Sequence, residues 1–468
     1  MQNIAISTPK QAEEILNKLH NAGYKAYIVG GCVRDSLLGI KPKDWDICTS
    51  ASPEQAESVF TGEHIIETGL QHGTITIMKK GEPFEVTTFR IDGEYSDGRH
   101  PDSVSFTDSL EEDLSRRDFT INAMAYNKEE GLIDPFGGQI DLEIKLIRCV
   151  GDPDARFEED ALRILRALRF SCKYGFDIHF ETAISMRDKS HLLNNISAER
   201  IQGELCKILT ADTDNVYRTL KTKADIFHTI LPETSAMWGF TQNNPWHCYN
   251  VWMHTLHAVK NCESKDLITR LAVLFHDIGK PLCHQVDEDG IDHFRGHGKV
   301  SAEITNRIMR RLKFDNETRH NVVTLVGMHD NTIEPSKPAV KRLLGKIGIE
   351  QLRRLIDLRI ADVKAQNPQM ENGRIAKAEL ILSLAEDIVK KQECFSLKNL
   401  AVNGHDLIEI GYQPDGTLGQ ALNHLLNEVI DGKLPNNKEE LLKEADGLLY
   451  LIKCTERENT DEEERNID

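Results

Sequence analysis

The sequence predicts an α+β protein in which a small mixed sheet with helices is followed by mostly α-helical regions. Short apolar segments bounded by glycine and other turn residues recur within roughly the first 90 residues, which is typical of short strands. From about residue 150 onward, apolar residues recur instead at helical spacing. Because 468 residues exceed what one hydrophobic core usually holds, we expect roughly two to four domains.

The composition narrows the class of protein. Hydrophobic residues make up 40% and charged residues 28% of the chain, which is typical of a soluble globular protein. No apolar run approaches the length of a membrane span, and the N-terminus lacks the apolar stretch of a secretory signal, so we expect no membrane contact. The ten cysteines include no C-x-x-C pair, which predicts reduced thiols and a cytoplasmic location.

The net charge of −18 argues at first sight against nucleic-acid binding. Part of this charge is local, because residues 456–468 hold seven acidic and two basic residues and are typical of a disordered tail. Residues 337–364, by contrast, hold eight basic and three acidic residues. We therefore expect any contact with RNA to be confined to local basic regions.

The first chemical pattern is a glycine turn between an apolar run and a segment with helical spacing. Gly30 and Gly31 form the turn, and Arg34 follows it. Such a turn lets backbone N–H groups approach a phosphate, and arginine can bind phosphate through two N–H groups at once. The pattern indicates phosphate binding, although a Gly-Gly pair between strand and helix is also a common plain turn.

Two aspartates follow in the next apolar segment. If 43–48 is a strand, Asp44 and Asp46 point to one face, because residues i and i+2 share a face. Two carboxylates this close repel each other, and a divalent cation with oxygen ligands relieves the repulsion. The glycine turn and the two aspartates together predict a metal-assisted nucleotidyl transfer site. Without the turn, two aspartates at this spacing could simply lie on a solvated strand edge and bind no metal.

The other elements predicted for the small sheet region are a helix over 11–20, a helix starting at Ser52-Pro53, and strands over 73–78 and 84–90. Glu85 lies on the second of these strands. It is either a third carboxylate beside Asp44 and Asp46 or a solvated residue of the strand edge. Residues 92–102 are polar and rich in turn residues, which predicts a loop with Asp97 and Arg99 as its polar side chains. Ser109 to Glu112 fits a capping box at the start of the next helix.

In residues 151–170, Gly-Asp-Pro precedes a predicted amphipathic helix, and the i to i+3 and i to i+4 spacings place Asp160 and Glu159 beside Arg163. The simplest interpretation is an ordinary surface ion pair. A fixed carboxylate–guanidinium pair can also read the edge of a nucleobase, because the carboxylate accepts from an exocyclic amine while the guanidinium donates to ring atoms.

Half of the 18 histidines lie within about 80 residues from Trp246 onward. Most isolated histidines are structural, but His276-Asp277 ends a strongly apolar helix, where a carboxylate without a partner would be costly to bury. Gly279 follows as the expected helix stop. Imidazoles and carboxylates are the usual ligands of a hydrolytic transition-metal site.

Four stretches carry a family resemblance: 28–46, 115–125, 158–169 and 254–277. Together they resemble the class II tRNA nucleotidyltransferases, the CCA-adding enzymes, and the likeness covers nearly the whole chain except the acidic tail. The last stretch also resembles the HD-domain phosphohydrolases. The resemblance implies a polymerase beta-like nucleotidyltransferase head, template-independent addition of C, C and A to the 3′ end of tRNA from CTP and ATP, and Mg²⁺ in the head.

The resemblance also implies roles for individual residues of this sequence. Asp44, Asp46 and Glu85 would be catalytic, with Mg²⁺ on the two aspartates. The implied nucleotide-binding residues are Gly30, Gly31, Arg34, Arg117, Asp118, Asn122, Asp160, Arg163, Arg166 and Arg169. Among them, Asp118 and Asn122 would bind the ribose 2′-hydroxyl, and Asp160 and Arg163 would bind the base. The loop with Asp97 and Arg99 would favour full CCA addition or A addition.

In the HD region, the resemblance implies a divalent transition metal such as Mn, Ni or Co on His254, His276, Asp277 and Asp362. His297 and His329 are candidates for a second metal, and Lys280, Lys337 and Arg342 are candidate phosphate contacts. Hydrolysis of phosphate monoesters or 2′,3′-cyclic phosphates and a purely structural role both stay open.

The predicted domains are a head over 1–147, a helical neck over 148–240, an HD domain over 241–365, a tRNA-contacting helical region over 366–452 and a disordered acidic tail over 453–468. The nearest alternatives are an A-adding enzyme and a bacterial poly(A) polymerase, which shares the head motifs but usually ends in a basic extension. A (p)ppGpp synthetase–hydrolase would carry its HD domain first. A non-enzymatic RNA-binding protein is the last alternative.

Overall fold

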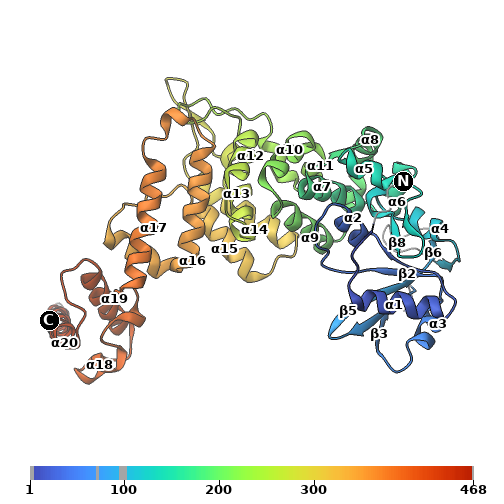
Figure 1. The fold of residues 1–468 in the computed structure, drawn as a ribbon. Helices are drawn as coiled ribbons and strands as arrows, with labels where there is room; N and C mark the ends of the chain where they lie inside the picture. The colour runs from blue at the N-terminus through green and yellow to red at the C-terminus, as the bar shows by residue number, and fades with distance from the viewer. Residues whose placement is uncertain (1–4, 70–72, 94–102, 466–468) are drawn as a thin grey trace. The chain divides into compact units, whose positions relative to one another are not determined.

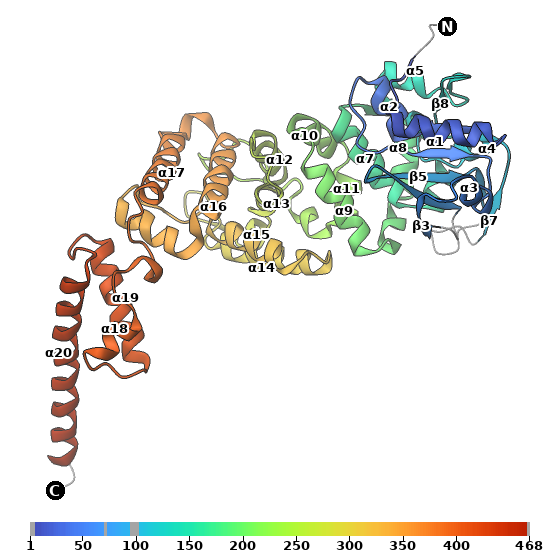
Figure 2. The same ribbon diagram turned by 60° about the horizontal axis from the view of Figure 1, so that its bottom comes forward.

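The computed structural model describes residues 5–69, 73–93 and 103–465 (Figures 1 and 2). The chain divides into two compact units, one of residues 1–235 with 308–314 and one of residues 236–307 with 315–468. Asp97 and Arg99 of the predicted loop lie outside the described residues, between two short paired strands, β6 (Arg90–Asp92) and β7 (Val104–Phe106).

The first unit is built on a mixed sheet of seven strands in the described part of the chain, in the order β3-β4-β5-β2-β1-β8-β9. The strands are β1 (Ala26–Val29), β2 (Ile47–Thr49), β3 (His64–Gly69), β4 (Thr74–Lys79), β5 (Glu82–Thr88), β8 (Ala125–Asn127) and β9 (Gly131–Ile133). β2 and β5 run parallel, and the other pairs are antiparallel. The mixed sheet predicted for this region is thereby confirmed.

Local chemistry explains several of these elements. β1 is buried along its whole length, as its unbroken apolar run requires. The two strands predicted around residues 73–90 are β4 and β5, and they are joined by Lys80 and Gly81, both with positive φ, which suits the tight hairpin turn. The Ser52 hydroxyl accepts from Gln55 N, and Gln55 completes a capping box, so the predicted helix start is confirmed.

The helices of the first unit are α1 (Lys10–Asn21), α2 (Gly31–Leu37), α3 (Pro53–Val59), α4 (Leu110–Ser115), α5 (Gly138–Glu143), α6 (Pro153–Glu159), α7 (Leu162–Tyr174), α8 (Phe180–Asp188), α9 (Ala198–Leu209), α10 (Thr213–Thr222) and α11 (Ala224–Ile230). Ser109 caps α4 by accepting from Glu112 N, but the Glu112 carboxylate accepts from Thr107 instead of closing the predicted capping box. The single helix predicted within 151–170 is wrong, because the chain is extended at Asp160 between α6 and α7.

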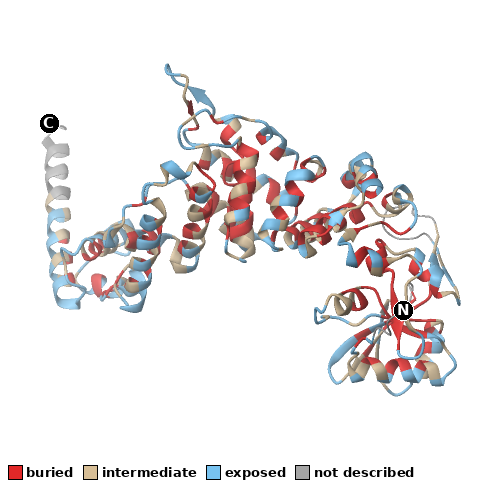
Figure 3. Ribbon diagram, turned by 45° about the horizontal axis from the view of Figure 1, so that its top comes forward, coloured by how far each residue is buried: buried red, intermediate tan, exposed pale blue. Residues whose placement is uncertain are grey.

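The second unit is mostly helical. Its helices are α12 (Val251–Asn261), α13 (Leu267–Phe275), α14 (His297–Arg311, whose end groups with the first unit), α15 (Asn316–Met328), α16 (Lys337–Lys364, broken at Gly348), α17 (Arg374–Lys390), α18 (Gly404–Glu409), α19 (Gly416–Ile430) and α20 (Lys438–Arg465). Buried residues concentrate on the inner faces of these helices and along the central strands of the first unit (Figure 3).

Two predictions for the second unit need correction. Gly279 does not end a helix through a left-handed conformation, since its φ is −87°; a Cβ there would lie 2.6 Å from Ser301 N, so glycine permits close packing on α14. The tail predicted as disordered from residue 453 continues as α20 to Arg465. Buried Leu441, Ala445 and Leu449 anchor the first part of α20, and elongating a formed helix costs far less than nucleating one.

Candidate functional site

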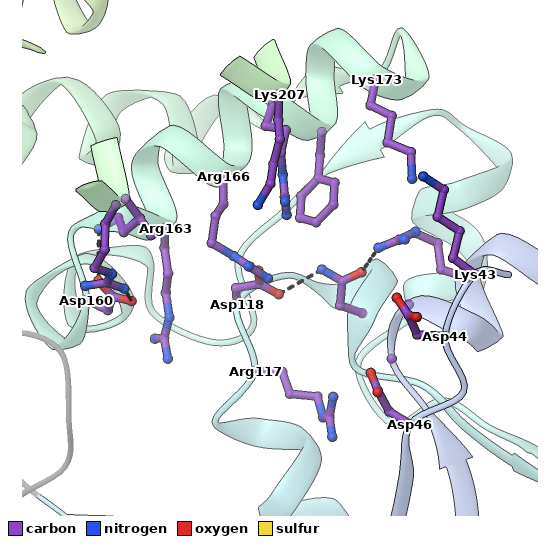
Figure 4. Close-up of a pocket in the computed structure, with 18 of the residues that line it drawn as sticks. Lys43, Asp44, Asp46, Arg117, Asp118, Asp160, Arg163, Arg166, Lys173 and Lys207 are labelled. Carbon is purple, nitrogen blue, oxygen red and sulfur yellow. Dashed lines mark hydrogen bonds and ion pairs between the residues drawn. The ribbon is translucent and has the colours of Figure 1, made fainter. Parts of the chain in front are cut away.

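A pocket of about 950 Å³ in the first unit collects side chains from the start of α2, the segment before β2, the residues after α4, and helices α7 and α9 (Figure 4). In the described part of the chain, ten cationic and four anionic side chains line it. The cationic ones are Arg34, Lys43, Arg116, Arg117, Arg163, Arg166, Arg169, Lys173, Arg200 and Lys207. In a chain of net charge −18, this local excess of positive charge suits a polyanionic ligand.

Asp44 and Asp46 both line the pocket, with their carboxylates directed to the same side (Figure 4). The strand predicted over 43–48 begins only at Ile47, so both aspartates precede it. Val29 N nevertheless donates to Asp46 O at 2.9 Å, which ties this segment to β1. The aspartates therefore precede a fully buried strand that pairs with β1.

The charges around Asp46 favour a cation. Burial raises the pKa of the Asp46 carboxyl, and the carboxylates of Glu85 and Asp44 raise it further, while the Arg117 guanidinium opposes them. Glu85 is exposed on β5, beside Val86, which pairs with Ile47 of β2. It does not line the pocket itself. Oxygen ligands that repel one another at this spacing fit a hard divalent cation such as Mg²⁺.

Gly30 is required by the backbone and by its neighbour. Its φ of 78° is unfavourable for other residues, and a Cβ would lie 2.9 Å from Nη1 of Arg117. Arg117 in turn pairs with the fully buried Asp113, with 3.3 Å between Nη2 and Oδ2. The glycine turn thus lets a guanidinium, held by a buried carboxylate, reach the pocket.

A continuous polar chain crosses the back of the pocket. Arg34 donates to the Asn122 side-chain oxygen, Asn122 Nδ2 donates to Asp118 Oδ1 at 2.9 Å, and Arg166 Nε donates to Asp118 Oδ2 at 2.8 Å. Burial alone would raise the pKa of Asp118, but the Arg166 guanidinium and the Asn122 amide lower it to about 2. Asp118 is therefore ionised and immobile at neutral pH.

Acidic pH should lower the free energy of unfolding of the first unit, because Asp118 becomes protonated. Because its folded-state pKa of about 2 lies below the ordinary 3.8, the paired carboxylate stabilises the fold above about pH 4, and this contribution is lost as the pH falls toward 2. We expect Asp118→Asn to lower the free energy of unfolding by about 2 kcal/mol at pH 7 and by clearly less at pH 3. Urea denaturation at both pH values measures this free energy, with Asp108→Asn as the exposed control. An equal loss of stability at pH 7 and pH 3 would contradict the low pKa assigned to Asp118.

The predicted ion pair between Asp160 and Arg163 is wrong. Arg163 pairs with Glu159, one turn back, as the i to i+4 spacing predicts, whereas Asp160 Oδ2 pairs with Arg200 Nη2 of α9 at 2.6 Å. The reason is the break at Asp160, whose other oxygen accepts from Leu162 N at 3.0 Å and starts α7. Both groups still line the pocket, each fixed by its own partner.

Sequence reasoning missed several pocket residues: Lys43, Arg116, Phe170, Lys173, Arg200 and Lys207. Lys173 had a usable signal, since it continues the helical row that runs through Arg166 and Arg169. Arg200 had none, because only packing brings α9 beside Asp160. Arg169, one of the implied nucleotide-binding residues, lines the pocket, and its Nε lies 3.1 Å from Glu204 Oε2.

The second unit holds a buried cluster of imidazoles and carboxylates. His254 Nε2 lies 3.2 Å from Asp277 Oδ2 and 3.0 Å from Asp362 Oδ1. His276 Nε2 lies 3.2 Å from Asp277 Oδ2 and 3.3 Å from His254 Nε2. The structure therefore brings all four predicted metal ligands together, although Asp362 is 85 residues beyond Asp277 in the sequence.

Asp277 also faces a second group. Its Oδ1 lies 3.3 Å from His297 Nε2 and 3.7 Å from His329 Nε2. His254, His276 and Asp277 form one set with metal-ligand spacing, and Asp277, His297 and His329 form another. Asp277 is thus shared by two adjacent sets of ligands.

Backbone carbonyls orient all four imidazoles. The Nδ1 atoms of His254, His276, His297 and His329 lie 3.3, 2.8, 2.8 and 2.7 Å from carbonyl oxygens of Ala365, Val273, Phe294 and Val326. Each Nδ1 therefore donates to its carbonyl and each Nε2 faces the cluster, as in metal sites. Burial opposes protonation of His276, but Asp277 and Asp362 raise its pKa to about 10, so the cluster attracts positive charge that a metal would supply.

The phosphate contacts proposed for this unit need partial correction. Lys280 lines the adjacent pocket of about 630 Å³, with its Nζ 2.7 Å from Asp277 Oδ2. Lys337 and Arg342 do not line it, because they pair with Glu393 and Asp431 elsewhere on the unit. The pocket's other cationic and imidazole residues, missed in the sequence, are His247, His293, Arg295, Arg359 and Arg374.

Comparison with known proteins agrees with this geometry. The profile of the "Poly A polymerase head domain" matches residues 26–148, that of "tRNA nucleotidyltransferase domain 2" residues 296–445, and "Probable RNA and SrmB- binding site of polymerase A" residues 175–237. A CCA-adding enzyme of Limosilactobacillus fermentum is 33% identical over 94% of this chain and 96% of its own length. The chain belongs to the CCA-adding enzymes.

Two further members of the family are informative. The CCA-adding enzyme of Geobacillus thermodenitrificans is 49% identical over 43% of this chain and 49% of its own length. The crystal structure of the Bacillus stearothermophilus CCA-adding enzyme in complex with CTP is 29% identical, covers 98% of this chain and all of its own, and superposes with a TM-score of 0.70. The predicted family and fold are confirmed, and CCA-adding enzymes act with a divalent metal ion.

In the described part of this CCA-adding enzyme, no helix is both long and apolar enough to cross a bilayer.

Proposed function

We propose that the pocket of the first unit is the nucleotidyl transfer site, where the chain adds C, C and A to the 3′ end of tRNA from CTP and ATP and releases pyrophosphate. The observation that carries the proposal is the Asp44–Asp46 pair, which opens onto a strongly cationic pocket that also contains the Asp160–Arg163 region. Ten free thiols also support a reducing, cytoplasmic compartment for this reaction.

Asp44 and Asp46 would hold Mg²⁺ in this site, with Glu85 as the third carboxylate. When bound, Mg²⁺ favours the ionised 3′-hydroxyl of tRNA and neutralises charge on the leaving pyrophosphate. The protein's own contribution is placement. Arg34 and Arg117 are held by Asp35 and Asp113 and direct N–H donors at the triphosphate, and the chain of Asp118 and Asn122 offers an acceptor and a donor to the ribose 2′-hydroxyl.

Base selection rests on Asp160 and Arg163. Cytosine and adenine both present an exocyclic amine beside an unprotonated ring nitrogen, whereas uracil and guanine present a carbonyl beside a ring N–H. A carboxylate that accepts and a guanidinium that donates therefore match the first two bases only. Arg200 and Glu159 fix these two groups, so the choice requires no template strand.

Stepwise incorporation tests the proposal. tRNA transcripts that end before the first C, or after the second C, are incubated with CTP or ATP alone. We expect CTP to extend only the first transcript and ATP only the second. Addition of A without C would identify an A-adding enzyme, and repeated addition of A would identify a poly(A) polymerase.

The Mg²⁺ dependence of nucleotide addition should depend on Glu85 but not on other exposed residues of β5. We expect Glu85→Gln to raise the Mg²⁺ concentration for half-maximal nucleotide addition by about tenfold, because one negative charge near Asp46 is lost. Glu82→Gln, an exposed change on the same strand, serves as the control. An unchanged Mg²⁺ dependence in Glu85→Gln would remove Glu85 from the metal site.

The second unit supports a second candidate function, a metal-dependent phosphohydrolase acting on phosphate monoesters or 2′,3′-cyclic phosphates. Four imidazoles with their Nε2 atoms turned inward around Asp277 favour it over a scaffold. His254, His276, Asp277 and Asp362 would hold one transition metal such as Mn, Ni or Co, and Asp277, His297 and His329 a second. A metal bound there would activate water for attack on phosphorus.

A further inference from the structure

We propose that the phosphohydrolase site acts on a phosphate at the end of an oligonucleotide, and that a second cavity binds the neighbouring nucleotide unit. The proposal rests on the hydrolase activity proposed above and names its substrate class. In the reaction, water forms a new bond to phosphorus, the bond from phosphorus to the ribose oxygen breaks, and that oxygen takes a proton. The products are inorganic phosphate and an oligonucleotide with a free hydroxyl.

The second cavity adjoins the metal pocket. It has a volume of about 210 Å³ and is lined by Thr332, Ile333, Arg359, Val363, Arg374, Lys377, Ala378 and Ile381. Arg359, Val363 and Arg374 also line the pocket that contains Asp277 and Asp362. These three side chains therefore lie where the two cavities meet.

The lining of this cavity suits a nucleobase. Ile333, Val363, Ala378 and Ile381 are all buried and supply apolar surface for the faces of a flat ring. Its volume corresponds to about seven waters, enough for one ring system and too little for a folded partner or a duplex. A single nucleotide unit is the matching size.

The two arginines stand where the linking phosphate would pass. Arg359 Nη2 donates to Asn331 O at 2.7 Å, and Arg374 Nη1 donates to Gln366 Oε1. Because a guanidinium has five N–H groups, each can still donate to a phosphate. On the exposed side of the cavity Lys377 adds a third positive charge, 4.0 Å from Glu334.

The position of Arg374 is tied to the metal ligands. Gln366, which accepts from Arg374, donates from Nε2 to Asp362 Oδ1 at 2.9 Å, and Arg374 also lies 5.4 Å from the centre of the Trp246 ring. The spacing between the metal cluster and this guanidinium is therefore set by a short chain of hydrogen bonds. A free mononucleotide or phosphate would occupy the metal pocket and leave the second cavity unused.

The test compares substrates of increasing length on the intact protein loaded with Mn²⁺. A mononucleotide 3′-phosphate, the dinucleotide and the hexanucleotide with the same terminal phosphate are hydrolysed in parallel. We expect KM to fall at least tenfold from mononucleotide to dinucleotide and less than twofold from dinucleotide to hexanucleotide, because one neighbouring unit is bound. Equal KM values for mononucleotide and dinucleotide, or a preference for a phosphorylated peptide, would overturn the proposal.

Two variants make the result specific to the cavity. Ala378→Trp fills it, and Lys377→Glu reverses a charge at an exposed position. Both should raise KM for the dinucleotide at least fivefold, whereas Lys390→Ala, exposed on the same helix, should change nothing. Unchanged dinucleotide KM in Lys377→Glu would reject the cavity as the binding site.

Binding without turnover provides an independent readout. A dinucleotide with 2-aminopurine at the inner position is titrated into EDTA-treated protein, and the quenching of its fluorescence is measured. Quenching that is lost in Lys377→Glu and Ala378→Trp supports binding in the cavity. Equal quenching in all three proteins contradicts it. Hydrolysis of p-nitrophenyl phosphate separates a failure of the proposed hydrolase activity from a failure of the proposed nucleotide-binding cavity. If the Mn²⁺-loaded protein cleaves neither this compound nor any nucleotide, the hydrolase activity itself is rejected.

Discussion

Asp44→Ala is expected to reduce incorporation of CMP and AMP into tRNA by about a thousandfold or more. The substitution removes one of two carboxylates for the metal ion, and several kcal/mol of transition-state stabilisation are lost with it. Single-turnover incorporation on both tRNA transcripts measures the effect. Binding of tRNA should change little, because the cationic residues of the pocket are kept.

Asp108→Ala is the matched control, since it removes an exposed carboxylate outside the pocket. Incorporation by Asp44→Ala at the rate of the unchanged protein would show that the carboxylate pair does not hold the catalytic metal. The same outcome would favour a non-enzymatic role for the pocket.

Asp277→Asn is expected to remove transition metal from the second unit and to reduce phosphate ester hydrolysis by about a thousandfold or more. Asp277 belongs to both sets of ligands, so one neutral substitution weakens both. Nucleotide addition should continue, because its site is built from residues of the first unit only. Metal content per chain, hydrolysis and CCA addition are measured on the same preparation.

Asp289→Asn, an exposed change in the same unit, should keep both metal and activity. Full metal content in Asp277→Asn would contradict its role as the shared ligand. Loss of CCA addition together with metal would instead assign the cluster a structural role in the whole enzyme.

Features set by a few neighbouring residues were predictable. The turn at Gly30, the cap at Ser52 and the hairpin at Lys80-Gly81 depend on backbone preferences that act within a few residues. The break between α6 and α7 was not predictable in this way. The apolar spacing continues through Asp160, while the side chain of that aspartate starts a new helix.

The sequence by itself determined the family, the carboxylate pair Asp44–Asp46 and the adjacent pair His276-Asp277, because each is recognisable from residue types at short spacing. Only the tertiary structure decided which partners these chemical groups have. Arg200 meets Asp160 from forty positions away, and His297 and His329 reach Asp277 from separate helices. Periodicity relates residues within one helix or strand, whereas contacts between elements follow from how their buried faces pack, and that is not encoded in local spacing.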